Sequence, residues 1–186
     1  MGGHHLVLGE ISDYLTGEIL ADTHDERYRQ GIARLLIEEK GYGREELIPR
    51  VPIDIRAGGK AARVRLDLIV CIDEQISMLI KYAPGSLTTR HQVALAASRL
   101  LAPSQVPVSV VTNGREADII DNLTTDVVAK GLEGIFSRTA LLHYLRGRET
   151  ILVTDHHRDL AARILYAYEV DGRCPCDDTV CEYEQR

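Results

Sequence analysis

Three runs of branched apolar residues follow one another in the middle of the chain, and their order restricts the fold more than any other feature. Segments 46–56, 61–73 and 75–83 are rich in Val, Ile and Leu, and glycine, acidic or proline-containing turns separate or end them. Such runs between turn residues are typical of β-strands. Because the connections are short, the sequence predicts that the three strands pair antiparallel, as a meander.

A predicted helix and a further strand come next and determine the class of fold. Segment 87–103 has apolar residues at helical spacing, and segment 106–114 holds a nearly continuous apolar run of the kind found in buried strands. A strand, a helix and a second strand in this order predict a right-handed parallel crossover. The sequence therefore predicts an α/β fold with a mixed sheet flanked by helices.

Three more helices are expected on either side of this unit. Segment 23–41 places apolar residues on one helical face, between a polar N-cap and the glycine that ends it. Segments 138–147 and 156–170 also have helical spacing. They follow the predicted sheet, so we expect them to form a C-terminal helical extension.

Composition and charge limit the organisation and the partners. A chain of 186 residues that is 45% hydrophobic can bury one core, and we expect an α/β domain over 1–150 with a C-terminal helix and cysteine-containing tail over 151–186 packed on it. No leader-like segment and no long apolar run is present, which predicts a cytoplasmic protein without a membrane partner. The net charge of -6 argues against a broadly basic surface.

The order of five segments resembles the N-terminal domain of type I restriction enzyme R subunits, the HsdR_N family of the PD-(D/E)XK nuclease superfamily. The resemblance covers residues 11–145 and is carried by DYLTGEI, DERYRQGIARLLIEEKGY, RVRLDLIV, LIKYAPGSLTTRHQVALAASRLL and VPVSVVTNG. It implies a restriction-endonuclease-like core. It also implies the chemistry of the family, in which Mg²⁺ polarises a DNA phosphate and generates the attacking hydroxide.

The resemblance implies site residues as well. Asp67 and Lys81 map onto the catalytic Asp and Lys of the family motif, and Glu26 maps onto a helix acid that binds the metal together with Asp67. The family has a Glu two residues before the Lys, and here that position is Leu79. A hydrocarbon side chain offers Mg²⁺ no oxygen ligand. The motif is therefore incomplete, and Glu26 with Asp67 would leave a site of two acids.

Each of these residues also has a purely structural interpretation. Asp67 interrupts an apolar strand, and a charge there is costly unless it is paired; Lys81, Arg63 and Arg65 are candidate partners. Lys81 ends its strand, where a lysine can extend to solvent. Glu26 lies in the first turn of a helix, where the helix dipole alone favours an acid.

A polar segment follows the third strand of the meander and is a candidate anion site. Ser86, Thr89, Arg90 and His91 gather where the strand ends and the next helix begins. Free backbone N–H groups and the helix dipole favour an anion at such a place, and Arg90 can bind a phosphate through two hydrogen bonds. The segment predicts a phosphate or nucleic-acid contact, and the alternative is an ordinary capped helix.

Three cysteines lie within eight residues of the acidic tail. Cys174, Cys176 and Cys181 are spaced C-x-C-x₄-C, and in a cytoplasmic chain such a group binds metal more often than it forms disulfides. Zn²⁺ or an iron–sulfur cluster is the expected ligand, with His156 or His157 among the candidates for a fourth position. Some PD-(D/E)XK relatives hold such a cluster at the C-terminus, although their cysteine spacing differs from this one.

Three functions are compatible with the sequence. The favoured one is a restriction-endonuclease-like protein that binds nucleic acid or another phosphate-bearing ligand, with impaired or no cleavage. The second is an active Mg²⁺-dependent DNA nuclease that hydrolyses phosphodiesters at the incomplete site. The third is an interaction protein, in which the metal-binding cysteine tail contacts a partner protein or a second copy of the chain.

Overall fold

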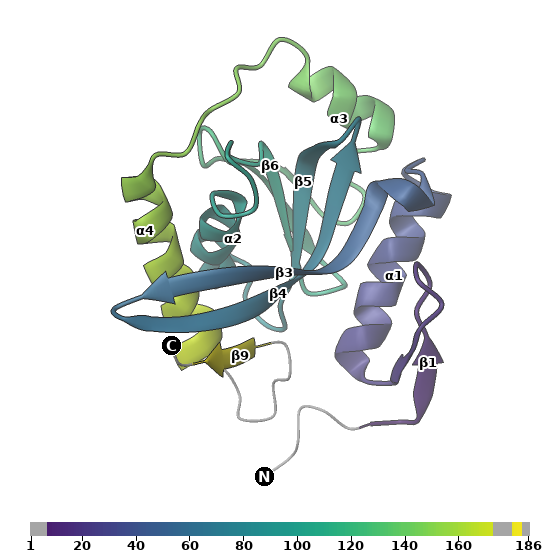
Figure 1. Cartoon of the computed structure of the whole chain (residues 1–186). Coiled ribbons are helices and arrows are strands. Elements are labelled where there is room, and N and C mark those ends of the chain that lie inside the picture. Colours follow the sequence, from purple (N-terminus) through teal and green to yellow (C-terminus); the bar gives the residue numbers. More distant parts are fainter. Residues whose placement is uncertain (1–6, 173–179, 184–186) are drawn as a thin grey trace.

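The computed structural model describes residues 7–172 and the backbone of residues 180–183, and its elements are shown in Figure 1. In chain order they are β1 (Glu10–Ser12), β2 (Ile19–Ala21), α1 (His24–Glu38), β3 (Leu47–Ala57), β4 (Lys60–Ile72), β5 (Gln75–Tyr82), α2 (His91–Ser98), β6 (Val108–Thr112), β7 (Ala117–Asp121), β8 (Val127–Lys130), α3 (Arg138–Leu145), α4 (Asp155–Leu165) and β9 (Val180–Tyr183). Single 3₁₀ turns precede β3 (Arg44–Glu46) and α2 (Thr88–Arg90), and a π-helical turn, Tyr166–Asp171, continues α4.

A seven-stranded mixed sheet forms the centre of the molecule. Six strands run in the order β3-β4-β5-β6-β7-β8. The remaining strand, β9, pairs with the first part of β4, residues 61–64. Among the strands that the structure describes, only β5 and β6 pair in parallel, and α2 connects them. The predicted α/β class, with a meander followed by a parallel crossover, is confirmed. The predicted helix over 87–103 is shorter in the structure, where the α-helix runs only from His91 to Ser98.

Helices cover both faces of the sheet, and the two larger hydrophobic cores lie beneath them. On one face Ile32 and Leu36 of α1 pack with Leu141 of α3 and with β5 and β6. On the other face α2 and α4 pack on β3, β4 and β5. Within residues 7–172, no helix is long and apolar enough to cross a membrane.

The β3–β4 hairpin is long and changes direction halfway. Its even-numbered β4 residues up to Leu66 belong to the core under α2 and α4, whereas those from Leu68 onward belong to the core under α1. Opposite this point on β3, Arg50 has a positive φ of 52° and pairs with no residue in the register. The two strands therefore turn over at Asp67, and Figure 1 shows the outer half of the hairpin running away from β5 toward α4 and β9.

Candidate functional site

Asp67 lies where β4 turns over, beside the C-terminal end of β5. Its carboxylate is 8% exposed and accepts a 2.7 Å hydrogen bond from Nε of Arg29, a residue of α1. Its second oxygen accepts a 3.0 Å hydrogen bond from the backbone N–H of Tyr82 and lies 3.5 Å from Nζ of Lys81. Of the three candidate structural partners, Lys81 is thus in contact, while Arg63 forms an ion pair with Asp54.

Lys81 is buried between two carboxylates. Its Nζ donates a 2.9 Å hydrogen bond to Oε2 of Glu169, which the π-helical turn after α4 brings to this point. The other oxygen of Glu169 is 3.8 Å from Arg90. Burial disfavours the charged lysine, but Asp67 and Glu169 outweigh this effect and raise the pKa of Lys81. Lys81 is therefore an ammonium ion held inside the protein.

Glu26 lies on the opposite side of Arg29 from Asp67. Thr23 caps α1 and starts the helix so that Glu26 and Arg29 share a face, with 3.7 Å between Oε2 of Glu26 and Nη1 of Arg29. The other oxygen, Oε1, accepts hydrogen bonds from Gln30 at 2.6 Å and Arg50 at 3.0 Å. The positive φ of Arg50 thus directs a second cation from β3 to this carboxylate.

Asp13 ends the series of contacts at the loop between β1 and β2. Its carboxylate accepts a 2.6 Å hydrogen bond from Arg50 and another from the backbone N–H of Thr16. Burial opposes its ionisation, but these hydrogen bonds and one from Gln30 outweigh burial and lower the pKa of Asp13 from 3.8 to about 2. Asp13 is therefore ionised throughout the neutral range.

Together these side chains form one chain of contacts in which acids and bases alternate. We call it the charge ladder, and its members in order are Asp13, Arg50, Glu26, Arg29, Asp67, Lys81, Glu169 and Arg90. It joins seven segments of the fold, from the loop after β1 to the turn after α4. A cavity of about 30 Å³ that is partly open to solvent lies against its first half, which is room for about two water molecules.

The ladder predicts how stability changes with pH. A carboxylate whose pKa is lowered by folding contributes fully above its unfolded pKa, and this contribution is lost as the pH falls through the folded value. For Asp13 that interval runs from 3.8 down to about 2, and the pKa of Asp67 shifts in the same direction, because Lys81 and Arg29 outweigh its burial. We expect thermal unfolding temperatures to fall across this interval. Asp13→Asn should flatten the decline, and an equally steep decline in that variant would contradict the assignment.

The predicted anion segment includes Arg90, the last member of the ladder. Ser86 and Thr89 are exposed, and Thr89 donates a 2.9 Å hydrogen bond to the carbonyl of Ser86. Arg90 faces Glu169, and Nε2 of His91 is 2.8 Å from Asp118. The structure brings the four residues together, with both basic side chains facing acids of the protein. The segment stays a prediction as a ligand site.

The predicted cysteine centre falls largely outside the described residues. Cys174 and Cys176 are among those not described, and of Cys181 only the backbone, in β9, is described. His156 and His157 lie exposed in the first turn of α4. Within the described part of the chain, no group of three or more His, Cys, Asp or Glu side chains is arranged to hold a metal ion.

Comparison with known proteins connects this geometry to a family. The model of the type I restriction enzyme R protein N terminus (HSDR_N) matches residues 24–135, which is more than half of the chain. This chain belongs to the HSDR_N family. No curated protein and no solved structure gives a significant match. The match runs from α1 to beyond β8 and includes Glu26, Asp67 and Lys81 but neither Asp13 nor Glu169.

The acids of this HSDR_N protein do not fit Mg²⁺ as they are arranged. The four acids of the ladder alternate with four cations, so its formal charge is already balanced. A hard dication needs free oxygen ligands, whereas Arg29 separates Asp67 from Glu26 and Lys81 separates Asp67 from Glu169. Leu79, at the position of the missing acid, is fully buried in the core under α2 and α4.

Sequence reasoning missed half of the ladder. The Glu26 and Arg29 contact follows from their spacing of three residues on one helix, so the sequence carried a signal for it. The contacts of Arg50 and Glu169 depend on an unusual backbone angle and on the packing of a distant turn, respectively. No local pattern reports either one.

Proposed function

We propose that this HSDR_N protein binds nucleic acid through its restriction-endonuclease-like fold and does not cleave it. The observation that carries the absence of cleavage is the pairing of Asp67 with both Arg29 and Lys81. Metal-assisted hydrolysis needs a carboxylate that is free to hold the ion and a lysine that is free to reach the phosphate. In the ladder both groups are committed to partners inside the protein.

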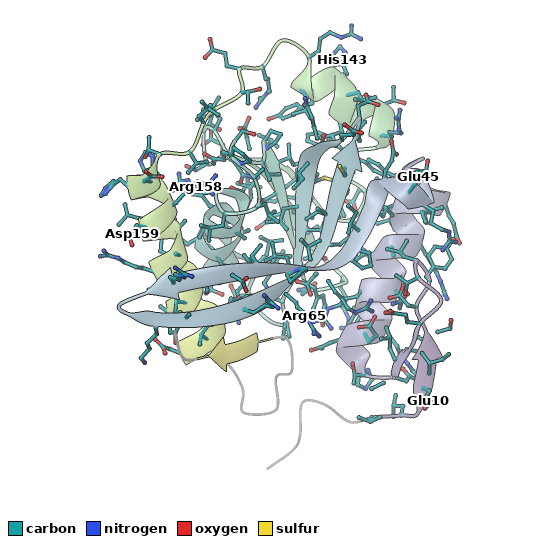
Figure 2. All side chains as sticks on the ribbon, viewed as in Figure 1. Glu10, Glu45, Arg65, His143, Arg158 and Asp159 are labelled. Carbon is teal, nitrogen blue, oxygen red and sulfur yellow. The ribbon has the colours of Figure 1, made fainter. Side chains whose placement is uncertain are left out.

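The outer half of the β3–β4 hairpin supports the binding part of the proposal. Arg56 and Arg65 are exposed there, on the face turned away from α4, and Arg63 with its partner Asp54 lies between them in the register. Figure 2 shows Arg65 on this hairpin, close to the place where its strands turn over beside the site. Phosphate contacts from such arginines provide affinity that does not depend on base sequence.

Binding and cleavage are tested with the same labelled DNA duplex. In a fluorescence anisotropy titration we expect an affinity that decreases with salt, because each phosphate contact releases counterions. Arg56→Ala with Arg65→Ala should reduce the slope of log K against log salt by about two. Arg146→Ala changes an exposed arginine at the end of α3 and should leave the slope unchanged, because α3 lies away from the outer half of the hairpin in Figure 1.

Cleavage is measured on that duplex, and on its single strands, in Mg²⁺ and in Mn²⁺. We expect intact DNA. If the parent produces cleaved DNA and the Asp67→Asn variant does not, the proposal is overturned and the protein is an active nuclease. Failure of the duplex and of both single strands to bind, even at low salt, would remove the nucleic-acid part and leave the interaction-protein hypothesis in front.

A further inference from the structure

Arg29 is held in one place by three different elements. Its Nε donates to Oδ1 of Asp67 on β4, and its Nη1 faces Oε2 of Glu26 one turn earlier on α1. Its guanidinium carbon lies 5.2 Å from the centre of the Tyr82 ring, a cation–π contact. The hydroxyl of Tyr82 in turn donates to Asp25 at 3.1 Å. The side chain is 28% exposed, so most of it is inside the protein.

The position of this guanidinium is the place where a metal ion shared by the two acids would lie. Oδ1 of Asp67 lies 2.7 Å from Nε of Arg29, and Oε2 of Glu26 lies 3.7 Å from Nη1 of the same guanidinium. Oδ2 of Asp67 is taken by the Tyr82 N–H, and Oε1 of Glu26 by Gln30 and Arg50. A metal could therefore bind both acids only by displacing Arg29.

We infer that the guanidinium of Arg29 is a built-in replacement for the divalent cation, and that removing it turns Asp67 and Glu26 into a metal site. Without Arg29 the ladder has four acids and three cations, and the oxygens of Asp67 and Glu26 that contact Arg29 lose their shared cation. Mg²⁺ and Mn²⁺ favour such carboxylate oxygens, with water in the remaining positions. The small cavity, which Asp67, Glu26 and Arg29 all line, and the volume vacated by the Arg29 side chain together provide room for those waters.

This inference deepens the proposed function, and it rests on that proposal for the claim that the site of the parent protein excludes metal. Its test needs no nucleic acid. Mn²⁺ is titrated into the full chain by calorimetry and by electron paramagnetic resonance. We expect no saturable binding at this site in the parent. Arg29→Ala should bind one Mn²⁺ at least about tenfold more tightly than any binding that the parent shows, because the ion no longer has to displace a positive charge from Asp67 and Glu26.

Two further variants make the test specific. Asp67→Asn combined with Arg29→Ala should lose the gained affinity, since one of the two ligands is neutral. Arg27→Ala is the matched control: Arg27 is on the same helix, is 51% exposed and pairs with Asp22, outside the ladder. It should bind Mn²⁺ as the parent does.

The outcomes separate this inference from the proposed function. Tight Mn²⁺ binding by the parent that Asp67→Asn abolishes would overturn the inference, and so would a folded Arg29→Ala or Arg29→Gln chain that gains no binding. Circular dichroism establishes folding, and Arg29→Gln retains most of the side-chain volume if the alanine variant unfolds. A protein that fails to bind DNA but gains Mn²⁺ affinity in Arg29→Ala would contradict only the proposed function.

Discussion

Lys81→Met is expected to lower the free energy of unfolding by about 3–5 kcal/mol, because it removes one partner from buried ion pairs. Lys81 is 8% exposed, and its ammonium lies within 3.5 Å of both Asp67 and Glu169. After the substitution the more distant Arg90, at 3.8 Å, is the only ionic partner that Glu169 keeps within the described part of the chain. Methionine has nearly the length of lysine, so the loss measures charge more than volume. Urea unfolding at neutral pH, followed by circular dichroism, gives the value.

Two comparisons show whether the loss arises from the buried carboxylates. Lys81→Met with Glu169→Gln should recover a large part of the stability. The second substitution removes the buried negative charge of Glu169, which Lys81→Met leaves without its nearest cation. Arg163→Met is the control for an exposed pair: Arg163 and Asp159 on α4 are 63% and 49% exposed, and such pairs contribute at most about 1 kcal/mol. A Lys81→Met chain as stable as Arg163→Met would show that the ladder does not stabilise the fold.

The antiparallel pairing of β3, β4 and β5, which places Asp67 beside Lys81, could be predicted from the sequence. The runs that form β3, β4 and β5 are long, rich in branched residues and separated by turns, so their pairing was determined locally. β7 and β8 were not predicted. Five-residue β7 has an acid at its end, and most of β8 is exposed, so neither gives a strong periodic signal. β7 depends on pairing with β6, and β8 depends on pairing with β7, which are tertiary effects.

The sequence indicated half of the ladder residues and the contact between Asp67 and Lys81, but none of the other contacts. Asp67 and Lys81 lie on neighbouring strands, and the pairing of β4 with β5 brings them together. Glu169 is 88 residues away from Lys81 in the chain. The packing of Tyr166 and Val170 in the core under α2 and α4 places Glu169 next to Lys81. A charge balance among distant residues is a property of the folded molecule. The motif therefore indicated a missing acid and Lys81, but it could not indicate Arg29 and Arg50, the other cations that contact the remaining acids.

Leu79→Glu, which restores the family residue, is expected to destabilise the protein by about 3–5 kcal/mol and to leave it unable to cleave DNA. Leu79 is fully buried and packs in the core formed with α2 and α4. Its side chain points to the same face of β5 as that of Lys81. That lysine already contacts two carboxylates, so a third acid would be buried beside like charges without a cation of its own.

Leu79→Met is the matched control, since a swap of similar volume in a core costs less than about 1.5 kcal/mol. Combining Leu79→Glu with Glu169→Gln removes a competing carboxylate, so Lys81 becomes available to the new acid and part of the stability should return. Urea unfolding measures both effects, and Mn²⁺ titration measures any gain of metal binding. If Leu79→Glu is as stable as Leu79→Met and binds Mn²⁺, then the absent acid alone keeps metal out, and the cations of the ladder are not the barrier. If it is unstable and binds none, the ladder and the apolar core at position 79 exclude the metal together.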